Sequence, residues 1–292
     1  MCIRDSIWTE TVGTAYALSW AIYPNKPFQT DYTIPVGENT GYSDFSNTFV
    51  IVQSTADDNP VTIDDPQNAG VEVSVTLDRG EVTQLHHTFS GTEISATYPV
   101  QTLYIAGQYH GLNNGALELR GYSAIPTSLW NNEYFNPVSG RTGGSGTELY
   151  IYNPGSEQSV NWYDLSGSGS FTIGAGVTVA FSDASAANHD VPDDSGVRLT
   201  AEYYFHVIGA ADTVNGSYEW GFNLLPSDLL VSEYFLGWAP GTRDDLGTPA
   251  NNCSPVWVTA TQNNTAISVD FSPSDGTFDE TYVLDQLESI RI

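Results

Sequence analysis

The stretch from Thr48 to Val138 decides the fold of this chain. It consists of TFVIVQSTADDNPVTIDD (48–65), VEVSVTLDRGEVTQLHH (71–87), EISATYPVQTLYIAG (93–107) and AIPTSLWNNEYFNPV (124–138). Val71–Leu77 alternates apolar and polar residues, which predicts a strand with one buried face. The Asp78–Glu81 segment that follows has the composition of a tight turn. The stretch as a whole predicts short strands joined by turns.

Pieces of this stretch return before and after it. Three tyrosines and three prolines recur at offsets of 102 and 100 residues: Tyr32, Tyr134 and Tyr234, and Pro24, Pro126 and Pro226. Val50–Asp64 also aligns without a gap on Val256–Asp270, at an offset of 206 residues. A fixed period indicates a repeat architecture. A period of this length suits one small domain or two blade-sized units.

The repeats suggest how the chain is divided. We expect residues 1–6 to be a non-native leader, 7–46 the end of a first repeat, 47–140 the second repeat, 147–241 the third, and 254–292 the start of a further one. Met1–Ser6 lacks the apolar core of a signal peptide and resembles linker sequence. The incomplete first and last pieces add up to about one repeat, which would give one closed domain if the repeats form a ring. They also suit a fragment of a longer secreted protein.

The composition predicts an all-β protein. Turn-forming residues are spread along the chain, and no long segment has helical periodicity. We expect each repeat to hold two four-stranded antiparallel meanders. A propeller-like ring of six blades is preferred, because the connections are short, and tandem β-sandwiches are the alternative. The ring predicts that Tyr16–Ala21 lies beside Tyr282–Ile290.

The charge balance excludes several partners. The chain has 8 basic and 35 acidic residues and a formal net charge of −27, which opposes binding to nucleic acid and to anionic membranes. No window of 18 apolar residues exists, so we expect no membrane insertion. Cys2 and Cys253 cannot form a disulfide framework. An acidic, lysine-poor chain of this kind suits an extracellular or cell-surface location in a salty medium.

Motifs for catalysis or metal binding are missing. The five histidines (His86, His87, His110, His189 and His206) have no ligand spacing. The acidic pairs fall in turns, where weak calcium binding is conceivable but turn formation is the simpler interpretation: Asp57-Asp58, Asp64-Asp65, Asp193-Asp194 and Asp244-Asp245. Glu118 or Asp164 could serve a glycosidase only with a second carboxylate across a cleft. We therefore assign no catalytic residue, no metal ligand and no cofactor, and the binding residues are unknown.

Aromatic residues are the remaining candidates for ligand contact. Trp130, Trp238, Tyr134 and Tyr234 could stack on sugars, but two of them recur at the repeat spacing, which favours a role in the core. Five further tryptophans are undecided between the two roles: Trp8, Trp20, Trp162, Trp220 and Trp257.

The order of these motifs resembles a known family. An acidic or amide turn before a strand occurs at Asp57–Val61 and at Asn263–Ile267, a strand ends in LDRGE at Leu77–Glu81, and Leu225-Pro226 precedes Glu233-Tyr234. This pattern is similar to the amino-terminal domain family of the IgG Fc-binding mucus protein, which also occurs in large secreted bacterial proteins. The likeness spans most of residues 20–292. Asn153-Pro154-Gly155 and Leu287, which stands where the first copy has Gly80, depart from it.

The resemblance implies an extracellular surface, matrix or adhesion role and brings no catalytic residues. Our hypothesis is a non-catalytic structural or adhesive repeat module of a larger secreted or surface protein, whose partner is an extracellular protein or glycan. A lectin-like module that binds a glycan or a protein is the alternative. A secreted glycosidase is the third reading.

Overall fold

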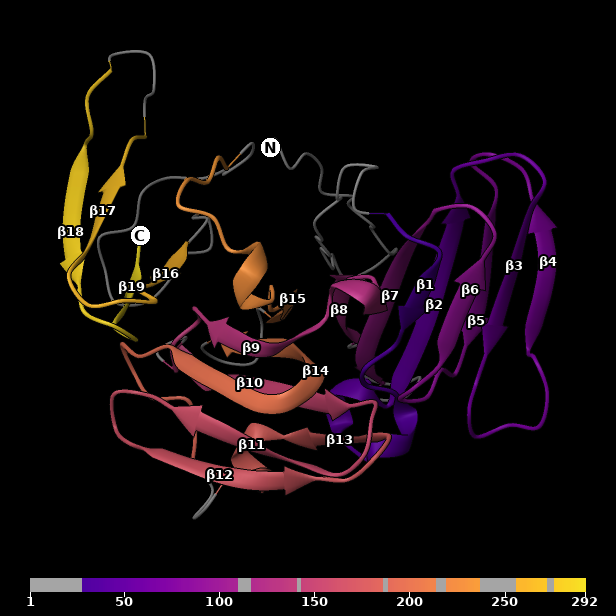
Figure 1. The fold of residues 1–292 in the computed structure, drawn as a ribbon, viewed down its shortest axis with the longest axis horizontal. Helices are drawn as coiled ribbons and strands as arrows, with labels where there is room; N and C mark the ends of the chain where they lie inside the picture. The colour runs from indigo at the N-terminus through magenta and orange to yellow at the C-terminus, as the bar shows by residue number, and fades with distance from the viewer. Residues whose placement is uncertain are drawn as a thin grey trace.

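The computed structural model describes residues 28–109, 117–140, 143–185, 189–213, 219–236, 256–271 and 276–292. They form an all-β structure, as predicted, in which three groups of strands follow one another along an arc (Figure 1). We call these groups unit 1 (residues 31–123), unit 2 (residues 131–223) and unit 3 (residues 231–292).

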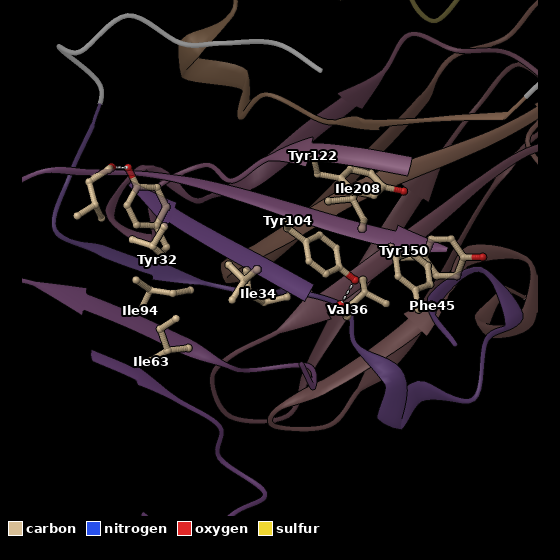
Figure 2. Packing of buried hydrophobic residues seen from close by; sticks show 14 of the residues in the cluster. Tyr32, Ile34, Val36, Phe45, Ile63, Ile94, Tyr104, Tyr122, Tyr150 and Ile208 are labelled. Atoms are coloured by element: carbon tan, nitrogen blue, oxygen red, sulfur yellow. Dashed lines mark hydrogen bonds between the residues drawn. The ribbon is translucent and has the colours of Figure 1, made fainter. Parts of the chain in front are cut away.

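Unit 1 is a sandwich of two antiparallel sheets. Its strands are β1 (Asp31–Thr33), β2 (Asn47–Ser54), β3 (Asn59–Asp64), β4 (Val73–Leu77), β5 (Val82–His86), β6 (Glu93–Ala96), β7 (Val100–Tyr109) and β8 (Leu117–Ser123). They pair in the orders β1-β6-β3-β4 and β5-β2-β7-β8. Side chains from both sheets belong to one buried cluster, with Tyr32, Ile63 and Ile94 from one sheet and Tyr104 from the other (Figure 2). Two apolar faces that bury each other in this way define a sandwich.

Unit 2 repeats this arrangement with one strand fewer. Its strands are β9 (Asn131–Asn136), β10 (Gly143–Asn153), β11 (Gln158–Tyr163), β12 (Ser168–Ile173), β13 (Val177–Ala180), β14 (Val197–Thr213) and β15 (Glu219–Asn223). The first part of β14 pairs with β9 and β11, and its second part pairs mainly with β10 and β15. The register shifts between Thr200 and Phe205. Thus the single strand β14 makes the pairings that β6 and β7 make separately in unit 1.

Unit 3 shows half of the same pattern. Its strands are β16 (Trp257–Thr259), β17 (Thr265–Val269), β18 (Glu280–Leu284) and β19 (Ser289–Arg291). β16 pairs with β19 and β17 with β18, as β2 pairs with β5 and β3 with β4. The offset of 206 residues read from the sequence therefore joins equivalent strands. Among the described residues of unit 3 there is no counterpart of β6, β7 or β8.

Short helices lie between the strands, and two of them mark equivalent places in successive units. They are η1 (Glu38–Thr40), η2 (Ser43–Phe45), η3 (Thr127–Leu129), α1 (Phe181–Ala184) and η5 (Ser227–Leu229). The 3₁₀ helices η3 and η5 directly follow Pro126 and Pro226, two of the repeated prolines. Of the helices that the structure describes, none has the length and apolar character needed to cross a bilayer.

The strand order corrects the predicted meander. β2 and β3 follow each other in the chain but lie in different sheets, and so do β4 and β5. The short turns at residues 55–58 and 78–81 carry the chain between the sheets, whereas the meander required them to stay within one. Turn composition does not distinguish these two cases.

The sheets face each other within a unit, so the tandem-sandwich alternative describes them. The propeller-like ring is not confirmed. Residues 16–21, which the ring places beside Tyr282–Ile290, lie outside the described part of the chain. Pairing also groups β1 with β6, and β9 with β14, across the boundaries drawn at residues 47 and 147.

One backbone hydrogen bond locks the crossing between β4 and β5, and its equivalents recur in units 2 and 3. The donor N–H and acceptor C=O belong to Gly80 and Ser54 (2.9 Å), Gly176 and Asn153 (2.8 Å), and Leu287 and Ala260 (2.9 Å). All three donors have positive φ, at 84°, 67° and 71°. Glycine adopts this conformation easily and leucine does not. The sequence departure at Leu287 therefore changes the side chain and leaves the path of the chain intact.

The repeated tyrosines share one hydrogen bond with the backbone. In each case the hydroxyl accepts from the N–H three residues earlier: Gln29 to Tyr32 (3.2 Å), Asn131 to Tyr134 (3.2 Å) and Val231 to Tyr234 (3.3 Å). Tyr32 and Tyr134 are buried, and they also donate to Val100 O and Phe205 O, both at 2.7 Å. Tyr234 is 60% exposed. The repeated tyrosine therefore has the same hydrogen bonds and the same burial in units 1 and 2. In unit 3 it has the same hydrogen bond from the N–H three residues earlier, but it is exposed.

Successive units are joined by equivalent contacts. Thr178 Oγ1 of β13 donates to Pro35 O at 2.5 Å, and Ser289 Oγ of β19 donates to Pro137 O at 2.6 Å. The two prolines are 102 residues apart, and the two hydroxyls occupy the same register position. Units 1 and 2 and units 2 and 3 thus meet through the same part of the sandwich.

Units 1 and 2 also share a hydrophobic core. Tyr150 and Ile208 of unit 2 belong to the cluster that contains Val36, Phe45 and Tyr104 of unit 1 (Figure 2). Their chain neighbours on β10 and β14 point into the core of unit 2 instead. Both faces of this sheet are therefore buried, one in each core, which makes the joint hydrophobic and fixed.

Replacing Tyr134 by phenylalanine should lower the free energy of unfolding by about 1–2 kcal/mol, because the buried groups of Asn131 and Phe205 lose their partner. Tyr234→Phe is the matched control, and it should cost less than about 0.5 kcal/mol because its ring is exposed. Chemical denaturation measures both changes. Equal losses in the two variants would show that burial of the Tyr134 hydroxyl does not add to stability.

Gly80→Ala should destabilise the chain by about 1 kcal/mol through its left-handed backbone alone. A Cβ at Gly80 meets nothing within 4 Å, so no clash contributes. Gly167→Ala, which also has open space but no left-handed φ, should be neutral or slightly stabilising. Thermal unfolding compares the two variants, and a loss of the same size at Gly167 would remove the conformational explanation.

Candidate binding surface

A buried amide holds the chain where it passes from β6 to β7. Asn59 Oδ1 accepts from Tyr98 N–H at 2.8 Å, and Asn59 Nδ2 donates to Tyr98 O at 3.1 Å. Nδ2 also donates to Ser54 Oγ at 3.0 Å. Asn59 is fully buried, so these bonds replace the partners that water would supply.

Gln158 performs the same task in unit 2. Its Oε1 accepts from Tyr203 N–H at 2.9 Å, and its Nε2 donates to Asn153 Oδ1 at 3.0 Å and to Tyr204 O at 3.5 Å. Asn153 and Gln158 stand where unit 1 has Ser54 and Asn59. A longer amide therefore holds an equivalent segment of backbone within the continuous strand β14.

We call the side-chain amides of Asn59 and Gln158, with the backbone that they bind, the amide clamps. Each clamp holds a tyrosine whose side chain faces solvent. Tyr98 is 47% exposed and Tyr203 is 53% exposed, and Tyr204 beside it is 50% exposed. Of the tyrosines, the two amides bind only the main-chain atoms, so the fold does not require an aromatic side chain at these positions. Hydrogen bonding with the Glu202 carboxylate raises the pKa of Tyr203 above its ordinary value. An exposed ring with few rotatable bonds is a favourable contact group for a protein or a sugar.

Sequence reasoning missed this pair. Tyr98 and Tyr203 are 105 residues apart, whereas the tyrosines that revealed the repeat are 102 and 100 apart. The difference arises between β13 and β14, where unit 2 has additional residues around α1. An alignment that allows a gap between β13 and β14 would have brought the two tyrosines together.

A second feature is an acidic cavity of about 430 Å³ between units 1 and 2. Carboxylates of Asp44, Glu148, Asp190 and Asp193 line it together with Tyr150. Tyr150 Oη donates to Asp44 at 2.9 Å, and Glu148 Oε1 accepts from Leu149 N–H at 2.9 Å. Desolvation raises the pKa of Glu148. The lining favours a positively charged group over an anion.

Asp164, Ser166 and His189 come together without forming a hydrolase triad. His189 Nε2 lies 2.5 Å from Asp164 Oδ2 and 3.4 Å from Ser166 Oγ. A triad places the carboxylate and the nucleophile at opposite nitrogens of the ring, whereas one nitrogen faces both here. Asp164 Oδ1 also accepts from Ser166 N–H and Gly167 N–H, so this carboxylate shapes a turn. The side chain of Glu118, the other glycosidase candidate, lies outside the described part.

Two other histidines, His86 and His87, are neighbours in the chain but contact different partners. His86 stacks on Phe49 with a centroid distance of 5.4 Å, while His87 Nδ1 lies 3.1 Å from Glu38 Oε1. His110 is outside the described residues. In the part of the chain that the structure describes, no three His, Cys, Asp or Glu side chains gather as metal ligands. Weak calcium binding by the acidic turns stays a prediction.

Two of the acidic pairs take part in turns. Asp57 Oδ1 accepts from Arg79 N–H at 3.1 Å, and Asp65 Oδ1 accepts from Gln67 N–H at 2.9 Å. Asp58 and Asp194 have positive φ. Asp244-Asp245 lies outside the described residues. The turn interpretation thus describes the pairs that are visible.

The aromatic candidates divide between core and surface. Trp130 and Tyr134 are buried, and Trp162 belongs to the core of unit 2. Trp220 and Trp257 pack on each other with a centroid distance of 5.5 Å. Tyr234 is exposed, and Trp8, Trp20 and Trp238 are outside the described part. The predicted role in the core is therefore confirmed for Trp130 and Tyr134 and is wrong for Tyr234.

His206 should make stability depend on pH. It is buried against Trp130, with a centroid distance of 4.7 Å, and burial lowers its pKa to about 3. The unfolded chain takes up this proton near pH 6.5, so the contribution of neutral His206 is present above pH 6.5 and is lost as the pH falls toward 3.

The slope that His206 adds approaches about 1.4 kcal/mol per pH unit below pH 6. His206→Gln, which takes up no proton, should therefore lose less unfolding free energy than the parent chain between pH 7 and pH 5. Urea denaturation at the two pH values measures this difference. Parallel pH profiles would show that His206 is protonated in the folded chain as easily as in the unfolded one.

Comparison with known proteins places the chain in a family. A family model described as IgGFc binding protein matches residues 19–208, which is more than half of the chain and includes the whole of unit 1 and most of unit 2. No curated protein matches the chain, and neither does any solved structure. The matched span contains both amide clamps and both exposed tyrosines. The chain therefore belongs to the IgGFc-binding protein family.

Proposed function

We propose that the chain is an extracellular, non-catalytic module of a larger secreted or surface protein, with an adhesive or structural role. Its family is one of binding proteins. The observation that carries the proposal is the pair Tyr98 and Tyr203. The repeated tyrosines Tyr32 and Tyr134 are buried, whereas the side chains of Tyr98 and Tyr203 recur at equivalent places and face solvent.

Recurrence of an exposed ring suits binding through several weak contacts. Units 1 and 2 each offer one tyrosine at the same place on the sandwich, and the fixed joint between these units holds the two rings in a constant relation. Simultaneous engagement of two such contacts raises affinity without any new chemistry. A rigid array is therefore better suited to adhesion than a flexible pair of domains.

The partner is an extracellular protein or a glycan. A net charge of −27 and the acidic cavity beside Asp44 and Glu148 favour a protein with a basic surface. Tyrosine rings also stack on sugars, so a lectin-like role is the second candidate. Binding to immunoglobulin Fc is part of the family description and is a question for measurement in this chain.

The test is a binding panel. Immobilised chain is exposed to matrix proteins, mucins, immunoglobulin Fc and a glycan array, and any saturable binding is measured again with the Tyr98→Ser, Tyr203→Ser double variant. We expect a loss of at least about tenfold in affinity, the size usual for removal of aromatic anchors. Tyr163→Ser is the control, because Tyr163 is exposed but lies outside the clamps.

Two results would contradict the proposal. One is saturable binding that the double variant leaves unchanged while its thermal unfolding is also unchanged. The other is hydrolysis of a glycoside or ester substrate above background that is lost when one carboxylate is mutated. Separation of glycan from protein ligands in the panel decides between the adhesive and the lectin-like role.

A further inference from the structure

The turn between β16 and β17 is a copy of the turn between β2 and β3. Asn263 Oδ1 accepts a hydrogen bond from Gln286 N–H at 3.0 Å. At the equivalent place in unit 1, Asp57 Oδ1 accepts from Arg79 N–H at 3.1 Å. The two acceptors are 206 residues apart, which is the offset that joins equivalent strands. An asparagine therefore does in unit 3 what an aspartate does in unit 1.

The backbone after this residue is copied as well. Asn264 has a φ of 55°, and its counterpart Asp58 has a φ of 50°. Asn264 N–H donates to Asp285 Oδ1 at 3.1 Å. In the same way, Asp58 N–H donates to Asp78 Oδ1 at 3.1 Å. The path of the turn and its hydrogen bonds are thus the same whether the turn carries amides or carboxylates.

The fold uses the side-chain oxygen of Asn263 and leaves the nitrogen unused. Aspartate has no donor nitrogen, so Asp57 shows that this position needs only an acceptor. Among the described residues, Asn263 has one side-chain hydrogen bond, and Oδ1 makes it. The buried Asn59 and Asn153 differ, because their Nδ2 atoms donate to Ser54 Oγ and to Ser156 O.

The side chain of Asn263 faces solvent, and this exposure is a property of the position in the sandwich. Asp57 in unit 1 and Ser156 in unit 2 stand at the same place, and both are exposed although both sheets of their units are present. The exposure of Asn263 therefore does not depend on which strands of unit 3 are described. A group attached to Nδ2 at this turn extends into solvent.

The residues after Asn263 complete a known acceptor motif. Asn263-Asn264-Thr265 has the pattern Asn-X-Thr, with X other than proline, which accepts N-linked glycans on surface loops of secreted proteins. The exposed turn supplies the context that this motif requires. Asn215-Gly216-Ser217 and Asn252-Cys253-Ser254 match the related Asn-X-Ser pattern, and both lie outside the described residues.

We propose that Asn263 is the acceptor of an N-linked glycan. The donor is an oligosaccharide carried on a lipid diphosphate. The bond from Nδ2 to C1 of the first sugar forms, the C1–O bond to the diphosphate breaks, and Nδ2 loses one proton as the lipid diphosphate leaves. Oδ1 keeps its lone pairs, so the hydrogen bond from Gln286 persists in the glycosylated chain. The inference rests on the extracellular location in the proposed function and goes beyond the tyrosine surface.

The test is to secrete the full chain from a eukaryotic cell line together with a reference glycoprotein. Peptide-N-glycosidase in heavy-oxygen water converts each glycosylated asparagine to a labelled aspartate, which mass spectrometry locates. We expect the label at residue 263 in most secreted chains. Asn263→Asp should lose one glycan from the intact mass and should unfold at the same temperature as the deglycosylated parent, because Asp57 fills this position in unit 1.

Thr265 offers a matched pair of variants that leave Asn263 in place. Its Oγ1 donates to Gln262 O at 2.7 Å. Thr265→Ser keeps this hydroxyl and the motif, so the glycan should be retained. Thr265→Val keeps the shape and removes the hydroxyl, so the glycan at Asn263 should be lost.

Three results would overturn the proposal. The first is an unmodified Asn263 in secreted chain whose reference glycoprotein is modified. The second is a label confined to Asn215 or Asn252. The third is a glycosylated chain in which the Gln286 amide loses its protection against hydrogen exchange, because the glycan and the native turn would then be incompatible. The proposed function fails separately, in the binding panel with chain made without glycans.

Discussion

Each unit depends on a hydrogen bond at the point where the chain returns from one sheet to the other. A residue with positive φ turns its N–H toward the last carbonyl of the first strand, and Gly80, Gly176 and Leu287 all do so. A chain that crosses between two packed sheets exposes peptide groups at each crossing, and these groups need partners when they are buried. The bond supplies one such partner and fixes the position of the turn relative to the end of the first strand.

The rest of the sandwich follows from this crossing. Because β2 and β5 lie in one sheet while β3 and β4 lie in the other, the alternating apolar residues of all four strands point into one core. The hydroxyls of Tyr32 and Tyr134 donate hydrogen bonds to Val100 O and Phe205 O, and these bonds join the strand that carries each tyrosine to the start of β7 or to the middle of β14. Units built in this way present the same surfaces, and Thr178 and Ser289 join them through the same hydrogen bond.

The sequence is informative wherever a residue is kept for a local reason. The spacing of Tyr32, Tyr134 and Tyr234 could be read from the sequence because each tyrosine accepts a hydrogen bond from the residue three positions earlier. Leu287 looked like a departure because the sequence records side chains, whereas the requirement at that position is one of backbone conformation. The meander was wrong because Asp57-Asp58 and Asp78–Glu81 look like turns whether the chain stays in a sheet or leaves it.

The binding surface was harder to predict than the fold. Unit 2 has additional residues between β13 and β14, before Tyr203. The offset of 102 residues that aligns Tyr32 with Tyr134 therefore does not align Tyr98 with Tyr203. Their meaning also depends on exposure, which a sequence does not record: the same residue type is buried at Tyr134 and exposed at Tyr203. The distinction matters for function, because buried repeats preserve packing, whereas an exposed repeat offers the same contact more than once.

The central claim is that the chain crosses between the two sheets in the same way in units 1 and 2 and in the half sandwich of unit 3, and NMR couplings through hydrogen bonds test it most directly. The account predicts couplings from the amide nitrogens of Gly80, Gly176 and Leu287 to the carbonyl carbons of Ser54, Asn153 and Ala260. Absence of these couplings, together with cross-strand contacts between β2 and β3, would contradict it.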